Sequence, residues 1–273
     1  MILSGKAVAD RILGEAKDIV SGLSVRPGFG VVLVGDNPAS RLYVGIKERR
    51  AAELGFIFRK EVLPTTATED EIIRAVDSLN VDRGIHGILV QLPLPDGLDT
   101  DLVIAAIDPK KDADGFHPDT VRKFLAGDRD SIPVFPEAIM ELATSADVVL
   151  SGKKGIAIVN SDIFGGIMKK AFEYEGMSAI IVKAEEIDGK ENEIREGDVI
   201  VTAIGQPGRF KRSIFKKGAI IIDGGISERD GNVYGDVSAE GDDADIFLAP
   251  VPGGVGPVTV ACLLRRVVRL AVG

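Results

Sequence analysis

The stretch Val31-Val-Leu-Val-Gly-Asp-Asn-Pro-Ala-Ser-Arg-Leu-Tyr-Val-Gly-Ile-Lys47 decides the fold. Its apolar residues end at Gly35, and Asp36-Asn-Pro38 is typical of a turn. Ser40 then offers an N-cap for a helix that we expect to continue to about Gly55. A strand, a turn and a helix in this order predict an α/β fold, in which ligands bind at the carboxyl ends of strands.

Tyr43 and Lys47 are four residues apart on this predicted helix. At that spacing both side chains project from one face, one above the other. An aromatic ring and an amine beside a strand end make a framework for a binding site. The ordinary alternative is a half-buried tyrosine and a solvated lysine, because most lysines are exposed.

The length and charge of the chain limit its function. With 273 residues the chain is long enough for two domains, and its net charge of -9 argues against nucleic acid or an anionic membrane as partner. One cysteine, Cys262, excludes an internal disulfide and a cysteine-based zinc site, and with only two histidines we predict no metal. Apolar runs are too short to span a bilayer and the N-terminus lacks a signal peptide, so we expect a soluble, cytoplasmic protein.

The first half of the chain alternates predicted helices and strands. A helix over residues 5–23 precedes the organising stretch, and Glu61-Val-Leu-Pro64 is a second short strand. Thr68-Glu-Asp-Glu71 resembles a capping box that opens a helix through Leu79, and residues 84–95 hold a third strand. This alternation predicts right-handed crossovers and a mainly parallel sheet.

Two polar residues stand where the chain turns after these elements. Gln91 falls where the third strand ends, and a buried glutamine there needs hydrogen-bond partners such as the Lys47 amine. The alternative is a structural residue at a strand end. Asp114 precedes Gly115, and is either a turn residue or a carboxylate that accepts the amino and ring N–H groups of a ligand. The spacing of its loop does not match a calcium-binding template.

The second half restarts the pattern after a helix predicted from Phe135 to about Leu150. A glycine-bearing turn is expected at 160–166 and a helix at 167–174. The strands of this half are expected at 155–159, 178–182, 198–207 and 218–224. The series indicates a dinucleotide-binding domain, in which backbone N–H groups and a helix N-terminus receive phosphates. Since the G-x-G-x-x-G fingerprint is absent, the inference rests on the series of strands.

A loop of unusual composition precedes the last predicted helix. Residues 250–257 hold three glycines and three prolines. Such a backbone permits close approach to a flat ligand, because glycine has no side chain and proline fixes the chain.

Together these motifs resemble the bifunctional methylenetetrahydrofolate dehydrogenase/methenyltetrahydrofolate cyclohydrolase family, nearly end to end. The segments that carry the resemblance are Ile2-Leu-Ser-Gly-Lys-Ala-Val-Ala9, Val34-Gly-Asp-Asn-Pro-Ala-Ser40, Tyr43-x-x-x-Lys47, Gly87-Ile-Leu-Val-Gln-Leu-Pro-Leu-Pro95, Lys111-Asp-Ala-Asp-Gly-Phe116, Ala203-Ile-Gly-Gln-Pro207, Ile222-Asp-Gly-Gly-Ile226 and Pro250-Val-Pro-Gly-Gly-Val-Gly-Pro-Val-Thr259. Each segment alone is weak evidence, whereas the whole series in this order is specific.

The resemblance implies two α/β domains that face each other across a cleft. Residues 1–135 and 256–273 would form a folate-binding catalytic domain, and residues 136–255 a Rossmann-type dinucleotide-binding domain. The family oxidises methylenetetrahydrofolate by hydride transfer to a nicotinamide cofactor and then hydrolyses the methenyl product to 10-formyltetrahydrofolate, which feeds purine biosynthesis. The resemblance also implies a homodimer whose partners are tetrahydrofolate one-carbon derivatives.

The resemblance further implies roles for individual residues. Tyr43 packs against the aminobenzoate ring, Asp114 holds the pterin edge, and Lys47, oriented by Gln91, is the proton acceptor for hydrolysis. The catalytic set is thus Lys47, Tyr43, Gln91 and Asp114, and the folate contacts add Leu92, Pro252, Gly253, Gly254 and Thr259. The cofactor contacts are Asn160, Ser161, Asp162, Ile163, Gly165, Lys183, Ala203, Ile204, Gly205, Gly225 and Ile226.

The nucleotide-binding turn departs from the family pattern Gly-Arg-Ser-x-x-Val-Gly-x-Pro. Asn160 stands in place of the arginine, and Ile167 in place of the proline. After the next strand, where a His-Ser pair is common, this chain has Lys183-Ala-Glu-Glu186. An acidic residue there favours a free ribose hydroxyl and hence NAD, whereas Lys183 favours a phosphate. We expect NADP, with NAD not excluded.

Two other hypotheses stay open at this point. The first is an enzyme that keeps the dehydrogenase and lacks the cyclohydrolase, against which the complete set of Tyr43, Lys47 and Gln91 argues. The second is a cofactor-sensing or scaffold protein whose catalysis has lapsed, and the altered turn at Asn160 is its only support.

Overall fold

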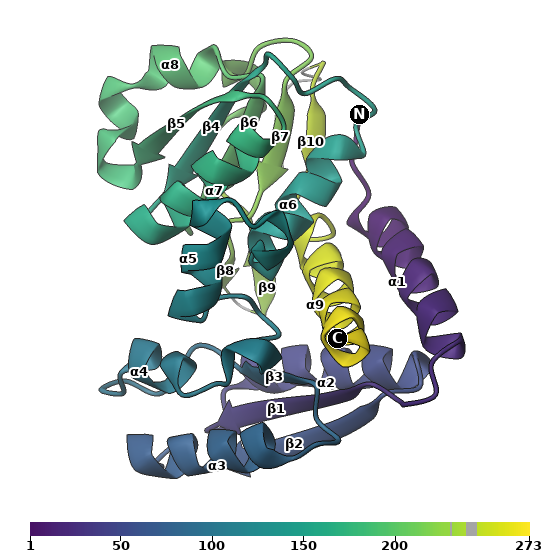
Figure 1. Ribbon diagram of the computed structural model, residues 1–273. Coiled ribbons are helices and arrows are strands. Elements are labelled where there is room, and N and C mark those ends of the chain that lie inside the picture. Colours follow the sequence, from purple (N-terminus) through teal and green to yellow (C-terminus); the bar gives the residue numbers. More distant parts are fainter. Residues whose placement is uncertain (230, 239–244) are drawn as a thin grey trace. The chain divides into compact units, whose positions relative to one another are not determined.

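The structure is a computed structural model that describes residues 1–229, 231–238 and 245–273. The chain divides into two compact units. The first unit comprises Met1–Asp10 with Gly127–Thr259, and the second comprises Arg11–Ala126 with Val260–Gly273. Each unit contains a parallel sheet with helices packed on it, which confirms the predicted α/β class (Figure 1). The functional division into residues 1–135 with 256–273 and residues 136–255 stays a prediction.

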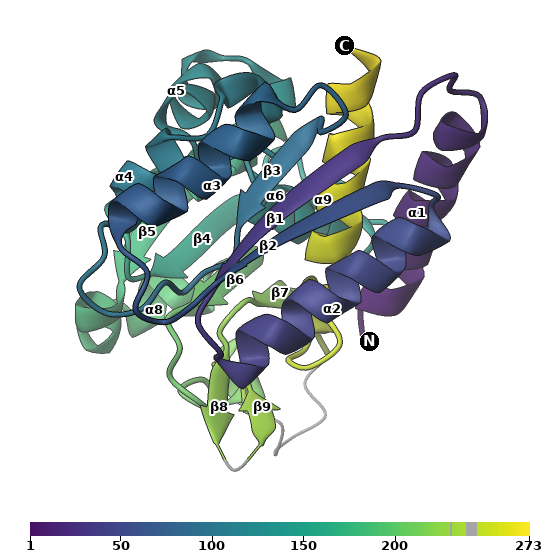
Figure 2. The same ribbon diagram turned by 90° about the horizontal axis from the view of Figure 1, so that it is seen from below.

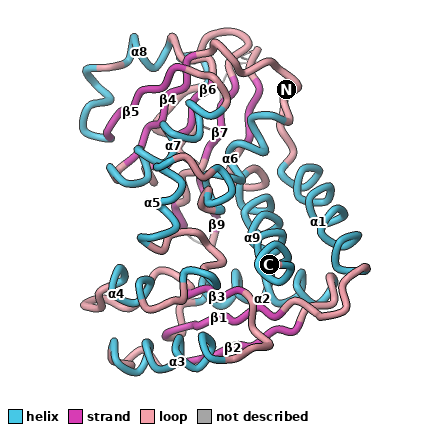
Figure 3. Tube along the Cα trace, viewed as in Figure 1, coloured by secondary structure: helices cyan, strands magenta, loops and turns pink. Residues whose placement is uncertain are grey.

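The second unit alternates strands and helices along the chain (Figure 3). Helices α1 and α9 each extend from one unit into the other. The elements that lie wholly or partly in the second unit are α1 (Gly5–Ser21), β1 (Gly28–Val34), α2 (Pro38–Glu53), β2 (Ile57–Leu63), α3 (Glu69–Val81), β3 (Gly87–Val90), α4 (Thr100–Ala105), the 3-10 turn η1 (Pro109–Lys111), α5 (Pro118–Ala126) and α9 (Val255–Val272).

The sheet of the second unit has the strand order β2-β1-β3, and both pairings are parallel. Val32 and Val34 of the central strand pack with Ile72 and Val76 of α3 in one buried cluster. The opposite face is as close-packed, because a Cβ on Gly87 of β3 would lie 2.7 Å from the Val267 side chain of α9. Figure 2 shows α2 and α3 on opposite sides of these strands, as right-handed crossovers require.

Both ends of helix α3 are capped by side chains. At the N-terminus, the Glu71 carboxylate accepts a hydrogen bond from Thr68 N at 2.8 Å, which confirms the predicted capping box. At the C-terminus, Lys111 Nζ donates to Asn80 O and Asp82 O, each at 2.7 Å, and to Leu79 O at 3.2 Å. The last carbonyl groups of a helix have no partner within it, and through these bonds Lys111 fixes the loop before Asp114 against α3.

The first unit contains a larger sheet and a hairpin. Its remaining elements are the 3-10 turn η2 (Arg129–Ser131), α6 (Val134–Thr144), β4 (Lys154–Val159), α7 (Asp162–Tyr174), β5 (Ser178–Lys183), the 3-10 helix η3 (Ala184–Gly189), α8 (Glu191–Arg195), β6 (Val199–Ala203), the 3-10 turn η4 (Arg212–Ile214), β7 (Ile220–Asp223), β8 (Ser227–Arg229), β9 (Asn232–Tyr234) and β10 (Phe247–Ala249). Strands β8 and β9 pair antiparallel, and the others form a parallel sheet of order β10-β7-β6-β4-β5.

The two faces of this sheet are covered differently. On one face, Phe172 of α7 packs so closely on β4 that a Cβ on Gly155 would lie 2.6 Å from its ring. On the other face, Ile156 and Ile158 of β4 pack with Ile187 of η3 and Ile194 of α8. The chain's N-terminal segment adds to the sheet edge, since Leu3 N donates to Leu248 O of β10 at 2.8 Å.

Several predicted boundaries differ from the structure. Strand β2 begins at Ile57 and not at Glu61, and α6 ends at Thr144 and not near Leu150, because Ser145 caps the helix there. Helix α5 was not predicted, since its sequence follows directly on a loop dense in charges and turn residues. Cys262 is fully buried, as expected for a small core residue. Among the described residues, no helix is both long and apolar enough to cross a membrane.

The close packing around β1 gives a prediction about stability. A Cβ on Gly28 would overlap the backbone carbonyl of Gly84, whereas a Cβ on Gly14, an exposed position in α1, meets no atom within 4 Å. We expect Gly28→Ala to lower the free energy of unfolding by about 1–3 kcal/mol through overpacking. Gly14→Ala should raise it by about 0.5–1 kcal/mol, because alanine favours the helix. Urea unfolding of both variants measures this, and equal midpoints would contradict it.

Candidate active site and nucleotide-binding site

Helix α2 presents Tyr43 and Lys47, both half-buried, from one face. Its N-cap is Asn37, whose side-chain oxygen accepts a hydrogen bond from Ser40 N at 3.0 Å. The prediction that Ser40 is the N-cap is therefore wrong. Pro38 already lies in the first turn, where its fixed φ suits a helix, so the cap must precede it.

Lys47 and Gln91 are joined by a hydrogen bond. Lys47 Nζ donates to Gln91 Oε1 at 2.7 Å, and Gln91 is only 9% exposed. The amide is held at its other end, since Nε2 donates to Leu92 O at 2.6 Å, and the backbone Gln91 N donates to Val32 O at 2.9 Å. The expected pairing of a buried glutamine with the Lys47 amine is thus confirmed, and it fixes the position of Nζ beside the end of β3.

The charges around Lys47 are coupled to Asp114. Burial lowers the pKa of the Lys47 amine, because the ammonium loses hydration, and the Asp114 carboxylate opposes that shift. Burial likewise raises the pKa of Asp114 to about 6, opposed by the charge of Lys47. Protein atoms surround this carboxyl group although part of the residue reaches solvent. The second unit therefore holds a base and an acid whose pKa values are moved toward neutrality from opposite sides.

The turn that carries Asp114 is built by its neighbour Asp112. This side chain is 1% exposed and accepts hydrogen bonds from Gly115 N and His117 N, both at 2.9 Å. Arg266 Nε donates to the backbone oxygen of Asp112 at 3.0 Å. Sequence analysis missed Asp112 and Arg266, although an aspartate three residues before a glycine is a signal for such a turn. Asp112 holds the backbone, and Asp114 is left to interact with Lys47.

The other predicted folate contacts are divided between the units. Leu92, 39% exposed, belongs to the second unit, while the remaining predicted contacts belong to the first. Gly253 has φ +97°, and its carbonyl accepts a hydrogen bond from Gly5 N at 3.0 Å. A Cβ on Gly254 would lie 2.6 Å from Pro250 O, so only glycine fits there. The Thr259 hydroxyl donates to Val255 O at 3.0 Å within α9, and Pro252 follows a cis peptide bond.

The turn after β4 leads directly into the capped N-terminus of helix α7. Ser161 caps α7 by accepting a hydrogen bond from Phe164 N at 3.3 Å, and Ile163 is exposed in the first turn. A Cβ on Gly165 would lie 2.9 Å from Ile181, so this glycine lets the helix approach the sheet closely. The helix was predicted to begin at Ile167 and begins instead at Asp162, because Ser161 supplies the cap.

Lys183 ends strand β5 beside this turn. Its Nζ lies 2.7 Å from Asp162 Oδ1 and donates to Asn160 O at 3.2 Å. Asn160 in turn donates from Nδ2 to Ile204 O at 3.0 Å, which ties the end of β4 to the end of β6. The structure thus brings together the predicted cofactor contacts of three neighbouring strands.

Buried carboxylates organise the strand ends on the other side of β4. Asp236 accepts hydrogen bonds from Thr202 Oγ1 at 2.7 Å, Ile204 N at 2.9 Å and Gln206 N at 2.7 Å. Asp223 accepts from backbone N–H groups, including Gly225 N at 3.0 Å, and burial raises its pKa to about 6. Sequence analysis missed both as site-forming residues. They shape the chain that follows Ala203, the last residue of β6, and the loops that carry Gly205 (φ +68°) and Ile226, which is 53% exposed.

These features fit a dinucleotide. Parallel strands present their carboxyl ends side by side, α7 offers backbone N–H groups, and Lys183 supplies a cation. The residues of the first unit could therefore hold a pyrophosphate and its riboses. Within residues 1–229, 231–238 and 245–273, no cluster of His, Cys, Asp and Glu side chains suits a metal ion.

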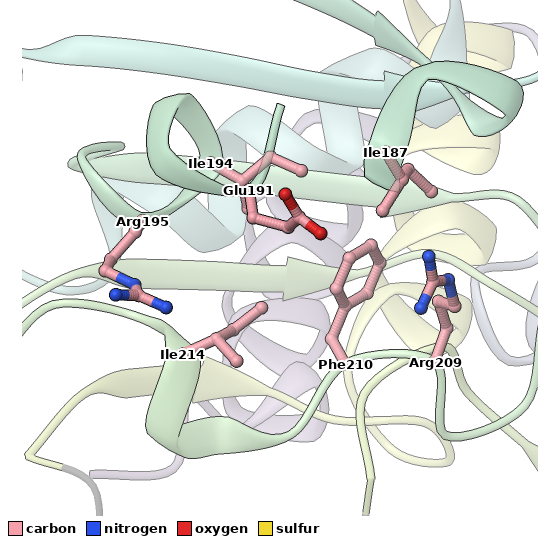
Figure 4. A pocket seen from close by; sticks show the side chains of 7 residues that line it. All are labelled: Ile187, Glu191, Ile194, Arg195, Arg209, Phe210 and Ile214. Carbon is pink, nitrogen blue, oxygen red and sulfur yellow. The ribbon is translucent and has the colours of Figure 1, made fainter. Parts of the chain in front are cut away.

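A separate pocket lies in the first unit under η3 and α8 (Figure 4). Its lining residues are Ile187, Glu191, Ile194, Arg195, Arg209, Phe210 and Ile214. None of the predicted site residues lines it. Arg209 is paired with Asp188, and the apolar residues continue the buried cluster on that face of the sheet.

Comparison with known families matches both halves of the chain. Residues 3–114 match the model described as "Tetrahydrofolate dehydrogenase/cyclohydrolase, catalytic domain". Residues 133–272 match the "Tetrahydrofolate dehydrogenase/cyclohydrolase, NAD(P)-binding domain". Lys47, Gln91 and Asp114 lie in the first match, and the turn after β4 lies in the second.

Individual relatives match over almost the whole chain. The bifunctional protein FolD of Enterococcus faecalis is 36% identical over 275 residues, which cover 99% of this chain and 98% of the relative. The crystal structure of the bifunctional enzyme FolD from Campylobacter jejuni is 34% identical, with a TM-score of 0.93 and coverage of 99% and 98%. The Trypanosoma brucei FolD, complexed with NADP cofactor and inhibitor, is 32% identical, with a TM-score of 0.91 and coverage of 99% and 96%. With these matches, the chain belongs to the tetrahydrofolate dehydrogenase/cyclohydrolase family.

Proposed function

We propose that this chain is a bifunctional enzyme that oxidises methylenetetrahydrofolate to methenyltetrahydrofolate and then hydrolyses the product to 10-formyltetrahydrofolate. Family membership over both halves supports the pair of activities. The buried Lys47 amine, hydrogen-bonded to Gln91, is the single observation that carries the hydrolytic step. A dehydrogenase alone would not require a base in that place.

The dehydrogenase step depends on positioning. When bound, NADP supplies the nicotinamide ring that accepts the hydride from the methylene carbon. The protein's task is to hold the two carbons about 3–3.5 Å apart and to exclude water. The residues proposed to hold the cofactor are Asn160, Ser161, Asp162, Ile163, Gly165, Lys183, Ala203, Ile204, Gly205, Gly225 and Ile226.

The cyclohydrolase step requires a proton acceptor, and we assign it to Lys47. An ordinary lysine with a pKa near 10.4 is protonated at neutral pH, so its amine has no lone pair to offer. Burial lowers the pKa of Lys47, and a cationic methenyl substrate would lower it further. As Lys47 Nζ takes a proton from water, the oxygen bonds to the bridging carbon. The bond from this carbon to N5 then breaks as the new hydroxyl group gives up its proton and becomes the carbonyl oxygen, N5 takes up a proton, and the formyl group remains on N10.

The neighbouring residues position the amine and the substrate. Gln91 accepts one hydrogen bond from Nζ and so directs the rest of the amine toward the ligand. Tyr43 projects from the same helix face and is proposed to pack on the aminobenzoate ring. Asp114 is proposed to hold the pterin edge, whose amino and ring N–H groups suit a carboxylate. Further folate contacts are proposed for Leu92, Pro252, Gly253, Gly254 and Thr259.

The oligomeric state, the location and the metabolic role of the protein are properties that the proposed site does not determine. A homodimer, a cytoplasmic location and a supply of one-carbon units to purine biosynthesis stay predictions from the sequence and the resemblance. Size-exclusion chromatography with light scattering measures the first of these directly.

Replacing the proposed base tests the mechanism. Lys47→Met should leave folate binding within a few-fold of the wild type and reduce the cyclohydrolase rate by about 100-fold or more, since general base catalysis typically supplies that factor. The measurement is the absorbance of the methenyl intermediate, which should form and persist in the variant. In the wild type it should form and decay.

The control for this experiment is Lys17→Met, which removes an exposed lysine of α1 and should leave both steps unchanged. Burial of the charged Lys47 costs folding free energy, so Lys47→Met should unfold at no lower urea concentration than the wild type. Full hydrolysis by Lys47→Met would remove Lys47 from the mechanism. In the wild type, an intermediate that persists would indicate a dehydrogenase alone, and no intermediate at all would indicate lapsed catalysis.

The raised pKa of Asp114 gives a prediction about pH. In the folded protein this pKa is about 6, against 3.8 ordinarily, so the native state binds more protons between these values. The free energy of unfolding should therefore fall, through this group, as pH rises from about 4 to about 6. Asp114→Asn should stabilise the protein more at pH 7.5 than at pH 4.5, by about 1–2 kcal/mol.

Urea unfolding at both pH values measures this difference. The matched control is Asp18→Asn, an exposed position of α1 in the same unit, which should show the same small effect at both pH values. If Asp114→Asn gave equal changes at pH 4.5 and 7.5, the carboxyl group would titrate normally and its proposed burial next to Lys47 would be wrong.

A further inference from the structure

Lys183 stands where a Rossmann domain recognises the ribose of its cofactor. It is the last residue of β5 and pairs in register with Val159, the last residue of β4. In such domains the residue at the end of the second strand meets the 2′-substituent of the adenosine ribose, with an acid for a hydroxyl and a cation for a phosphate. The position therefore selects between NAD and NADP.

The Lys183 side chain is largely buried, whereas the side chain of its ion-pair partner Asp162 is exposed. The Lys183 side chain is 19% exposed, whereas the side chain of Asp162 is 88% exposed. Nζ lies 2.7 Å from Asp162 Oδ1 and also donates to the backbone oxygen of Asn160 at 3.2 Å. An ion pair with so exposed a carboxylate contributes little to stability, so the carboxylate is readily displaced.

Two acidic residues, Glu185 and Glu186, follow β5, and the second of them is already engaged. Glu186 Oε2 accepts a hydrogen bond from Lys183 N at 2.9 Å and another from Lys190 Nζ at 3.1 Å. These bonds hold the pKa of Glu186 below its usual range, so it is ionised and committed to its own turn. The carboxylate that pairs with the Lys183 amine is the exposed one of Asp162.

We propose that Lys183 binds the 2′-phosphate of NADP and that Asp162 is the counter-ion which this phosphate displaces. The inference rests on the proposed function, in which NADP is the cofactor. A phosphate carries more charge than a carboxylate and makes charge-assisted hydrogen bonds, so the exchange favours the phosphate. Asp162 lowers the affinity for NADP, because its ion pair with Lys183 must break before the phosphate binds. Asn160 takes no direct part, since its side chain is bonded to Ile204 O.

The test measures binding of two small probes to the full chain by calorimetry. Adenosine 2′,5′-bisphosphate carries the 2′-phosphate and AMP lacks it, so the ratio of their dissociation constants isolates that group. We expect Lys183→Met to reduce the preference for the bisphosphate about 10- to 100-fold. Lys183→Arg should retain the preference, and Lys169→Met, which removes an exposed lysine of α7, should not change it.

Asp162→Asn tests the exchange itself. It should increase the preference for the bisphosphate about two- to fivefold, because no ion pair then has to break. In a chain that already carries Lys183→Met, the same substitution should leave the preference unchanged. An equal gain in both backgrounds would mean that Asp162 acts on the phosphate directly, which overturns the exchange. An unchanged preference in Lys183→Met would overturn the role of Lys183.

These binding experiments can fail independently of the proposed enzymatic activity. If the wild type forms no methenyl product from methylenetetrahydrofolate with NADP or NAD, the proposed activity fails, while the probe ratios still judge Lys183 and Asp162. If the wild type is active and its probe ratios do not depend on Lys183, the activity stands and the inference fails. Equal urea midpoints of the variants and the wild type exclude unfolding as the cause of weaker binding.

Discussion

The hydrogen bond between Lys47 Nζ and Gln91 Oε1 connects helix α2 to the end of strand β3. It forms because β3 lies beside β1, so that Gln91 N bonds to Val32 O and the glutamine side chain comes within reach of the helix that follows β1. Burial removes water from the Lys47 amine, and the single hydrogen bond to the Gln91 oxygen replaces only part of the lost hydration. A lysine with a lowered pKa is the consequence, and the proposed hydrolysis depends on it.

Parallel topology explains why the residues of both proposed sites lie at strand ends. In a parallel sheet all carboxyl ends point the same way, so the loops that follow neighbouring strands gather at one edge. In the second unit this edge carries Gln91, and in the first it carries Asn160, Lys183 and Gly205. The buried residues of the strands are mostly apolar, with Thr202 and Asp223 as polar exceptions, and the loops that follow the strands vary more freely. The replacement of the family's arginine by Asn160 is such a change, and Lys183 on the adjacent strand supplies a charge in the same region.

The periodic parts of the fold were predictable from sequence, because apolar repeats and capping residues act locally. All three strands of the smaller sheet, the strands β4 to β7 of the larger one, helix α1 and the Thr68–Glu71 capping box follow from such signals, whereas the edge strand β10 was not predicted. The start of α7 was misplaced because two glycines near its N-terminus suggested a turn, although Ser161 caps a helix there. Asp236 was missed for another reason: the backbone N–H groups of Ile204 and Gln206 come to its carboxylate only in the folded chain, whereas Asp112 binds N–H groups of its own turn and left a local signal in Gly115.

Two aspartates with a pKa of about 6 show why a perturbed pKa alone does not identify a site. Asp223 is fully buried, and backbone N–H groups of Gly225, Asp236 and Val237 occupy its oxygens, so it holds loops together. The pKa of Asp114 is raised equally, yet the charged group that interacts with it is the Lys47 side chain. The backbone of its turn is held by Asp112 instead. A carboxylate whose backbone support comes from a neighbour keeps its own oxygens for a ligand. The distribution of hydrogen-bond donors, more than the size of the pKa shift, therefore separates the carboxylate that we propose to bind substrate from the structural one.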